Sequence, residues 1–212
     1  MEHGNLKQAE TGKLITVGIT GIFGSGKTTV AGMFREEGFP CFSFDSIVHS
    51  ILEEGKVTGR IKKIFGGEVI REGKPDRKEL ARIVFRNENL KKKLEEIIHP
   101  LAFEKYRQII FDYKKKGGII VFEVPLLFET ESEAFFTKII VVSTSPYKIT
   151  SRLEGKFSIE DIKKRTESQI PLRYKEKKAA YVVYNSGSIS ETSVQVKKII
   201  RELKEELAEP GN

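Results

Sequence analysis

Residues 21–28 have the spacing G-x-x-x-x-G-K-[ST], which is typical of a loop that binds phosphate groups. Glycine suits such a loop because a residue without Cβ lets backbone N–H groups turn inward around phosphate oxygens. Lys27 would add positive charge beside the β- and γ-phosphates, and the Thr28 hydroxyl would supply an oxygen ligand to Mg²⁺. The spacing therefore predicts that this chain holds a nucleoside triphosphate.

The flanking residues decide between a phosphate-binding loop and an ordinary glycine-rich turn. Residues 14–19 form an apolar, β-rich run that predicts a buried parallel strand. Residues 29–37 have apolar side chains at helical spacing, and Gly38 follows where a helix cap is expected. Strand, glycine loop and helix in this order favour the phosphate-binding loop.

Two acidic residues that follow predicted strands are candidates for chemistry. Asp45 comes after the predicted strand 40–44, and Glu123 lies near the end of the predicted strand 119–124. In parallel α/β sheets, ligands gather at the carboxyl ends of the strands. Asp45 could accept a proton from an acceptor hydroxyl or hold Mg²⁺ through water, but it could equally be the N-cap of a helix beginning at Ser46. Glu123 could be a metal-site carboxylate, or it could form a salt bridge or a cap.

The histidines and lysines give weaker signals. The three histidines do not have the spacing of metal ligands. His49 lies one helical turn after Asp45, so it could line the same cleft, although a structural role is favoured. The lysine runs 91–93, 114–116 and 175–178 are typical of solvated helix faces, and aromatic residues do not alternate with them as in a base-stacking surface. A nucleic-acid partner is therefore not expected.

Strand signals alternate with helical patterns along the chain, which predicts an α/β fold with a parallel sheet. Between the second and third strands helical patterns dominate, with a capping box at Asp76 and Glu79 and a long helix expected to begin at Pro100. The last two strands are predicted at 138–143 and 181–184. We expect a flexible tail at 1–13, a nucleotide-binding core at 14–45 and 117–208, and a helical, substrate-binding insertion at 46–116.

Composition sets bounds on location and partners. The 212 residues carry a net charge of +7, from 37 basic and 30 acidic side chains, which a phosphorylated ligand explains as well as nucleic acid does. The single cysteine, Cys41, excludes an intrachain disulfide. No apolar run reaches membrane-spanning length, and the N-terminal segment lacks the apolar stretch of a signal peptide. We therefore expect a soluble cytoplasmic protein, a monomer or small homo-oligomer without a membrane partner.

Several motifs, in this order along the chain, resemble those of the dephospho-CoA kinase family, from Leu14 to about Ser188. Unrelated NTPases share the phosphate loop, so the combination carries the resemblance. Its most specific part is Val124-Pro125-Leu126-Leu127-Phe128-Glu129. The other matching segments are 20–29, 45–49, 76–80, 83–85, 94–100, Gln169, Lys177, 180–183 and 185–187.

The resemblance implies a nucleoside-monophosphate-kinase-like fold with a five-stranded parallel P-loop kinase core, a helical CoA-binding insertion and a short lid at about 152–170. It implies that the γ-phosphoryl group of ATP moves, with Mg²⁺, to the ribose 3′-hydroxyl of dephospho-CoA in the last step of coenzyme A biosynthesis. Lys27 and Asp45 would be catalytic, with Asp45 as general base. The remaining implied roles are ATP binding by Gly24, Ser25, Gly26, Lys27, Thr28, Thr29, Lys156, Asn185 and Gly187, acceptor binding by Asp45, His49, Arg77, Pro125 and Leu126, and metal binding by Thr28 and Glu123.

Three features differ from the family pattern. Ser43 stands where the family usually has the first of two acids, and Glu123 stands where it commonly has Asp. The lid is shorter, and Lys156 occupies the position of an arginine that contacts ATP. Lysine does not reproduce a bidentate guanidinium contact. Arg152 or Arg165 could compensate for the loss of that contact.

Three other functions fit parts of the sequence. Another small-molecule P-loop kinase, such as a nucleoside or nucleotide kinase, would share the loop but not the 124–129 motif or the helical insertion. A nucleic-acid-dependent NTPase would bind through a more basic surface, with steep salt dependence. A regulatory homologue without catalytic activity would be consistent with the altered lid.

Overall fold

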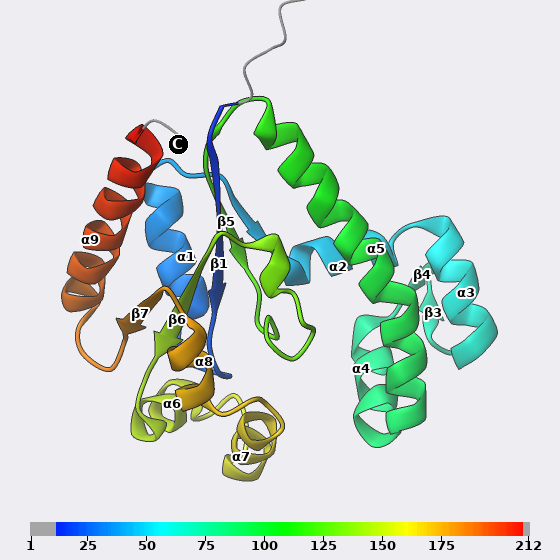
Figure 1. Ribbon diagram of the computed structural model, residues 1–212. Helices are drawn as coiled ribbons and strands as arrows, with labels where there is room; N and C mark the ends of the chain where they lie inside the picture. The colour runs from blue at the N-terminus through cyan, green and yellow to red at the C-terminus, as the bar shows by residue number, and fades with distance from the viewer. Residues whose placement is uncertain (1–11, 210–212) are drawn as a thin grey trace, which may run out of the picture. The chain divides into compact units, whose positions relative to one another are not determined.

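The computed structural model describes residues 12–209, which divide into two units (Figure 1). The first unit runs to Phe42 and resumes at Ile110, and the second is Ser43–Ile109. Most of the predicted tail 1–13 lies outside the described residues. Its last residue, Lys13, is anchored, because its carbonyl accepts a hydrogen bond from Gly118 N at 2.9 Å.

The chain forms a five-stranded sheet with the strand order β2-β5-β1-β6-β7. β1 pairs in parallel with β5 on one side and with β6 on the other, and β6 pairs in parallel with β7. The five-stranded α/β core predicted from the sequence is therefore confirmed. The strands are β1 (Leu14–Thr20), β2 (Cys41–Ser43), β5 (Gly118–Glu123), β6 (Lys138–Ser143) and β7 (Tyr181–Tyr184).

Two helices, α1 (Lys27–Glu36) and α9 (Ile189–Ala208), pack against each other and against the sheet (Figure 1). Neighbouring residues of a strand point to opposite faces, so alternate residues of β1 meet these helices. Burial of each such aliphatic side chain contributes about 1.5–3 kcal/mol. The shared core contains Ile15, Val17 and Ile19 of β1, Val30 and Phe34 of α1, and Val196, Ile199 and Leu203 of α9.

The other face of β1 is covered by the chain that follows β5. A Cβ on Gly18 would lie 2.7 Å from Leu127 Cδ1 and 2.9 Å from the ring of Phe136. Both of those side chains are buried. Glycine is therefore required at this position, because the segment after β5 packs directly on the backbone of β1.

Three helices follow β6. They are α6 (Pro146–Leu153), α7 (Ile159–Glu167) and α8 (Leu172–Lys178). The predicted lid at 152–170 runs from the end of α6 through α7 to just before α8. Ile149 of α6 and Ile162 of α7 pack with Ile22 of the phosphate loop in one buried cluster. This segment is thus docked on the loop through apolar contacts.

One lysine of the run 175–178 does not lie on a solvated face. Lys175 is fully buried, and its Nζ lies 2.7 Å from Glu129 Oε1. The interpretation from the lysine run is therefore wrong at this residue, because a carboxylate from another part of the chain neutralises the buried ammonium group.

The second unit consists of helices and one short hairpin. The hairpin lies between the second and third of these helices and was not predicted, because strands of two residues are too short for a period-two pattern. Its elements are α2 (Phe44–Leu52), α3 (Gly55–Phe65), β3 (Ile70–Arg71), β4 (Lys74–Pro75), α4 (Arg77–Arg86) and most of α5 (Glu88–Lys114).

The start of α2 differs from the prediction. The helix begins at Phe44, so Asp45 lies within its first turn and Ser43 occupies the N-cap position. The ring of Phe44 stacks on the buried ring of Tyr106, with 6.0 Å between the centroids. The N-cap interpretation of Asp45 is therefore wrong.

Pro100 does not begin a helix, because α5 continues through it over 27 residues. A proline inside a helix costs about 3 kcal/mol, since it removes a hydrogen bond and crowds the preceding turn. Ile97 and Ile98 before it, and Ala102 after it, are all buried. Burial of this continuous apolar face offsets the cost of the proline.

We expect Gly18→Ala to lower the free energy of unfolding by about 1–3 kcal/mol, because the added methyl group would overlap two buried side chains. Gly32→Ala in α1 is the matched control, since a Cβ there meets nothing within 4 Å. That control should gain up to about 1 kcal/mol from helix propensity. Chemical denaturation followed by circular dichroism measures both values. Equal stability of the two variants would contradict the packing of Leu127 and Phe136 on β1.

Candidate active site

The phosphate loop joins β1 to α1 in a conformation that requires glycine. Gly24 and Gly26 have φ angles of 75° and 95°, a region that side chains with Cβ adopt only with strain. Gly26 is the N-cap residue of α1 and supplies no side-chain cap. The first amide groups of α1 therefore remain available to an anion, which the helix dipole also favours.

Lys27 lies over this loop and is buried. Its Nζ donates to Gly21 O at 3.3 Å and to Ile22 O at 3.0 Å. Ser25 N donates to the same Ile22 oxygen at 3.2 Å. Carbonyl groups of the loop thus hold the ammonium group that the motif assigns to phosphate binding.

The pairing of β1 with β5 brings a carboxylate to the end of the loop. Ile19 lies opposite Glu123 in the parallel ladder, and Glu123 Oε1 accepts a hydrogen bond from Thr28 Oγ1 at 2.6 Å. A hydroxyl and a carboxylate oxygen side by side are ligands of the kind that Mg²⁺ takes, one or two from the protein together with waters and phosphate oxygens. Within residues 12–209 there is no group of three or more His, Cys, Asp or Glu that could hold a metal.

Asn185 connects the loop to the segment after β7. It is buried, its Nδ2 donates to Ser25 O at 2.8 Å, and its Oδ1 accepts from Thr192 Oγ1 at 3.0 Å. A Cβ on Gly26 would overlap the Asn185 amide. Asn185 therefore lies directly against the loop, whereas Gly187 lies in the turn before α9, where Ser188 and Glu191 form a capping box.

Two arginines of the predicted lid contact the phosphate loop, Arg152 at its backbone and Arg165 at the ring of Phe23, whereas Lys156 does not contact it. Arg152 donates from Nη1 to Ser25 O at 3.2 Å and from Nη2 to Asn185 O at 2.6 Å. The Arg165 guanidinium lies 5.3 Å from the ring centroid of Phe23, within cation–π distance. Lys156 is exposed at the C-terminal end of the turn after α6. Arg152 therefore lies directly against the phosphate loop, and the ATP contact of Lys156 stays a prediction.

The other predicted site residues of the first unit lie on the turns around the loop. Thr29 is exposed in the first turn of α1. Pro125 follows β5, and its carbonyl accepts from Thr20 Oγ1 at 3.4 Å. The Leu126 side chain beside it is 42% exposed. Their roles in binding an acceptor or ATP stay predictions.

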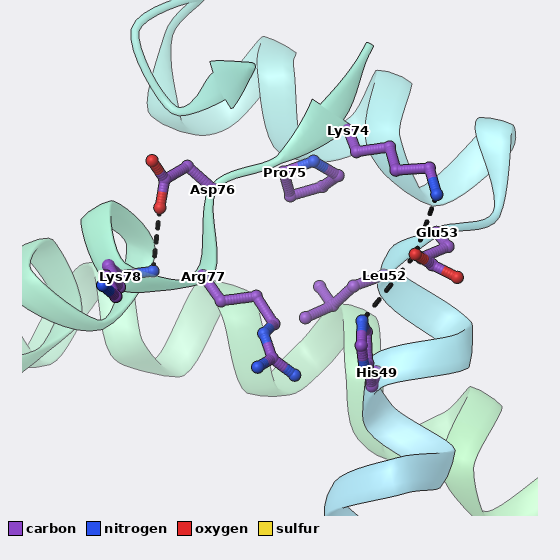
Figure 2. Close-up of a pocket in the computed structure, with 8 residues that line it drawn as sticks. All are labelled: His49, Leu52, Glu53, Lys74, Pro75, Asp76, Arg77 and Lys78. Atoms are coloured by element: carbon purple, nitrogen blue, oxygen red, sulfur yellow. Dashed lines mark hydrogen bonds and ion pairs between the residues drawn. The ribbon is translucent and has the colours of Figure 1, made fainter. Parts of the chain in front are cut away.

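The second unit contains a pocket of about 340 Å³ at the junction of α2, β4 and α4 (Figure 2). This volume lies within the range of sites for small molecules. The Arg77 side chain extends toward Leu52 and His49 (Figure 2). Of the five predicted acceptor-binding residues, His49 and Arg77 line this pocket. The lining residues are His49, Leu52, Glu53, Lys74, Pro75, Asp76, Arg77 and Lys78.

The first of the two acids in this pocket is Glu53. The hydrogen bond from Lys74 Nζ, at 2.9 Å, lowers the pKa of Glu53, with smaller electrostatic contributions from Lys74, His49 and Arg77. His49 Nε2 lies 3.7 Å from the same carboxylate oxygen. Glu53 is therefore ionised at neutral pH and holds both Lys74 and His49 in the pocket wall.

The second acid, Asp76, is the N-cap of α4, as predicted. It accepts hydrogen bonds from Lys78 N at 2.9 Å and from Glu79 N at 3.2 Å, and the latter is the main cause of its lowered pKa. Arg71 Nε lies 2.7 Å from its other oxygen. Both acids are thus neutralised by identified partners. Arg77, which forms no ion pair with a carboxylate in the described part of the chain, leaves the pocket suited to an anionic ligand.

Asp45 lies one turn before His49 on α2, in the second unit. Burial, and to a lesser degree the negative charge of Asp45, raises the pKa of Tyr106, so the phenol stays neutral near the carboxylate. Asp45 thus lies on the same helix as the pocket residues His49 and Leu52.

Comparisons with known proteins show the family of the chain. The family model for dephospho-CoA kinase matches residues 15–191. The chain belongs to the dephospho-CoA kinase family. A dephospho-CoA kinase from Aquifex aeolicus is 39% identical over 191 residues, which cover 88% of this chain and 96% of that protein.

Two further relatives support the same assignment. A dephospho-CoA kinase from Bacillus cereus is 36% identical over 192 residues, with 88% of this chain and 96% of the relative covered. The solved structure of dephospho-CoA kinase from Campylobacter jejuni superposes with a TM-score of 0.72 at 29% identity, covering 91% of this chain and 98% of that one. The fold and the family predicted from the sequence are both confirmed.

Sequence reasoning missed two contributors to the loop. Thr192 orients Asn185 from α9, and no motif signals it. Gln169 accepts a hydrogen bond from Phe23 N at 2.7 Å, although it entered the sequence argument only as part of the family resemblance. Thr192 and Gln169 each lie more than a hundred residues from the loop along the chain, and local sequence patterns do not indicate contacts over such separations.

We expect Asn185→Asp to weaken ATP binding and to lower the free energy of unfolding by about 1–3 kcal/mol, because an acceptor would replace the donor that faces Ser25 O. The matched control is Asn89→Asp, the same change on an exposed residue of α5. Thermal unfolding and calorimetric titration with ATP measure the two effects. Parental ATP affinity in Asn185→Asp would contradict its place in the loop.

Proposed function

We propose that the chain transfers the γ-phosphoryl group of ATP to the ribose 3′-hydroxyl of dephospho-CoA, giving coenzyme A and ADP in the last step of coenzyme A biosynthesis. Membership of the dephospho-CoA kinase family supports this reaction and substrate. The observation that carries the proposal is the 2.6 Å contact between Thr28 Oγ1 and Glu123 Oε1, which joins the phosphate loop to the carboxylate that we propose holds the metal.

The first unit would supply the phosphate side of the reaction. Phosphoryl transfer depends on positioning and charge neutralisation rather than on covalent chemistry by the protein. Amide groups at Gly24, Ser25 and Gly26, with the Lys27 ammonium group, would hold the β- and γ-phosphates. Thr28 and Glu123 would hold Mg²⁺, which supplies positive charge to the transferring group when bound.

The second unit would bind and activate the acceptor. Asp45 would orient the 3′-hydroxyl and accept its proton, a role that general bases fill with about a 10²- to 10⁴-fold effect on rate. His49 and Arg77 line a pocket whose acids are already paired, which suits the phosphate groups of dephospho-CoA. Pro125 and Leu126 would contact the acceptor from the turn after β5.

The segment 152–170 would close over ATP. Arg152 is held beside the loop by Ser25 O and Asn185 O, so it is the arginine best placed to replace the expected guanidinium. Lys156 would add a point charge from the exposed turn. Asn185 and Gly187 would contact the adenosine part of ATP. Closure that excludes water would limit hydrolysis of ATP without an acceptor.

The rival functions lack a supporting observation. A nucleoside or nucleotide kinase would share the loop, but the family match extends through the second unit and the 124–129 motif. A regulatory homologue without activity would not need Lys27, Thr28, Asp45 and Glu123, all of which are present.

We propose a cytoplasmic enzyme. Within residues 12–209, no helix has the length and apolarity needed to cross a membrane.

The direct test is an ADP-release assay with dephospho-CoA as the acceptor, run with and without Mg²⁺. Nucleoside monophosphates, and single-stranded DNA and RNA, serve as the competing acceptors or activators. Turnover that requires both dephospho-CoA and Mg²⁺ supports the proposal. Turnover with a nucleoside monophosphate but not with dephospho-CoA would favour the rival kinase, and stimulation by nucleic acid would favour the NTPase.

Asp45→Asn should lose about 10²- to 10⁴-fold in kcat, because an amide does not accept the proton of the 3′-hydroxyl. ATP affinity should stay at the parental value, since the phosphate loop is unchanged. Glu96→Gln, an exposed carboxylate-to-amide change in the same unit, is the control. Near-parental turnover of Asp45→Asn would refute the base assignment.

Glu123→Gln should raise the Mg²⁺ concentration needed for half-maximal rate at least several-fold, because the amide retains the shape but loses the charge beside Thr28. Glu36→Gln, at the exposed C-terminal end of α1, is the control. Magnesium titrations of the steady-state rate compare the two variants. Identical Mg²⁺ dependence of parent and Glu123→Gln would remove Glu123 from the metal site.

A further inference from the structure

The peptide group between Ile22 and Phe23 is held at both of its ends. Its carbonyl accepts hydrogen bonds from Lys27 Nζ at 3.0 Å and from Ser25 N at 3.2 Å. Its N–H donates to Gln169 Oε1 at 2.7 Å. The C=O and N–H of a trans peptide point in opposite directions, so fixing one of them fixes the other. The direction of the carbonyl that holds Lys27 therefore depends on Gln169.

Gln169 is itself held in place by a buried ion pair. The next residue, Ile170, donates its N–H to Glu129 Oε1 at 3.0 Å, and the same oxygen lies 2.7 Å from Lys175 Nζ. Lys175 is fully buried and the Glu129 side chain is only 16% exposed. Because removal of one partner leaves an uncompensated buried charge, this pair resists displacement and fixes the turn between α7 and α8.

The side chain of Phe23 is restrained as well. Its ring packs edge-to-face against Phe157, with 5.2 Å between the centroids. The Arg165 guanidinium covers both rings, at 5.3 Å from Phe23 and 5.1 Å from Phe157. Residues of the segment 157–170 thus contact Phe23 both at its ring and at its backbone N–H.

We propose that Gln169 is a positioning residue, which holds the Ile22–Phe23 peptide so that the Lys27 ammonium group stays directed at the ATP phosphates. This role rests on the ATP binding proposed above. Gln169 acts through the loop and not by touching ATP. Glu129 and Lys175 extend the same support into the core of the first unit.

The test measures ATP affinity of Gln169→Leu by calorimetry. Loss of the acceptor frees the Phe23 N–H and the peptide plane, so ATP should bind about tenfold more weakly. Adenosine, which has no phosphate groups, should bind both proteins equally. Gln169→Asn, whose shorter side chain does not reach Phe23 N, is a second variant that should reproduce the effect.

A double-mutant cycle separates positioning from general support. If Gln169 acts through Lys27, Lys27→Ala combined with Gln169→Leu should bind ATP no more weakly than Lys27→Ala alone. If the double variant instead loses ATP affinity by the product of the two single-variant factors, Gln169 acts independently of Lys27, and the proposal is overturned. Equal loss of adenosine and ATP affinity in Gln169→Leu would overturn it as well.

The local control is Thr166→Val, which removes a side-chain hydrogen bond to Ile162 O one turn before Gln169 and leaves the Ile22–Phe23 peptide untouched. It should bind ATP like the parent. A parent that neither binds ATP nor phosphorylates dephospho-CoA would overturn the proposed function and this inference together. A parent that does both, with a Gln169→Leu variant of equal ATP affinity, would overturn the positioning role alone.

Discussion

β1 lies between β5 and β6 and is hydrogen-bonded in parallel to both, and this pairing sets where the phosphate loop begins and which residues of β5 reach it. The ladder sets Ile19 opposite Glu123, so the end of β5 arrives beside the start of α1. One face of β1 carries aliphatic side chains into the core with α1 and α9. The other carries Gly18, whose missing side chain lets the segment after β5 pack on the strand itself. A shift of register by one residue would exchange these faces.

The phosphate loop is held mainly by residues outside its motif. Asn185 and Arg152 both bond to Ser25 O, and Gln169 bonds to Phe23 N. Glycines give the loop its left-handed turns, but they also make an isolated loop flexible. The three side chains, which arrive from α6, from the turn after α7 and from the end of β7, supply the rigidity that glycine does not. Rigid placement of charged groups before substrate arrives is the main physical source of catalysis in phosphoryl transfer.

The two units divide the proposed chemistry between them. The first unit contains the loop, the Thr28–Glu123 pair and the arginines, which we propose bind ATP and its metal. The second contains Asp45 on α2 and a pocket in which Glu53 and Asp76 are already paired with cations. Each unit is internally organised by its own hydrogen bonds, so variants in one are expected to leave the binding chemistry of the other intact. The Asp45→Asn and Glu123→Gln variants, each with its control, therefore probe the two units separately.

The sequence by itself determined the elements whose signals are local. The glycine-lysine spacing, the apolar strands and the capping residue Asp76 depend on residues within a few positions of one another, and the structure has them as predicted. The tertiary structure decided what depends on distant partners. It buried Lys175 against Glu129, carried α5 through Pro100, and brought Gln169 to a loop 146 residues away. The physical reason is that local patterns encode backbone preference and face, whereas the partner of a side chain is fixed only when the sheet has been assembled.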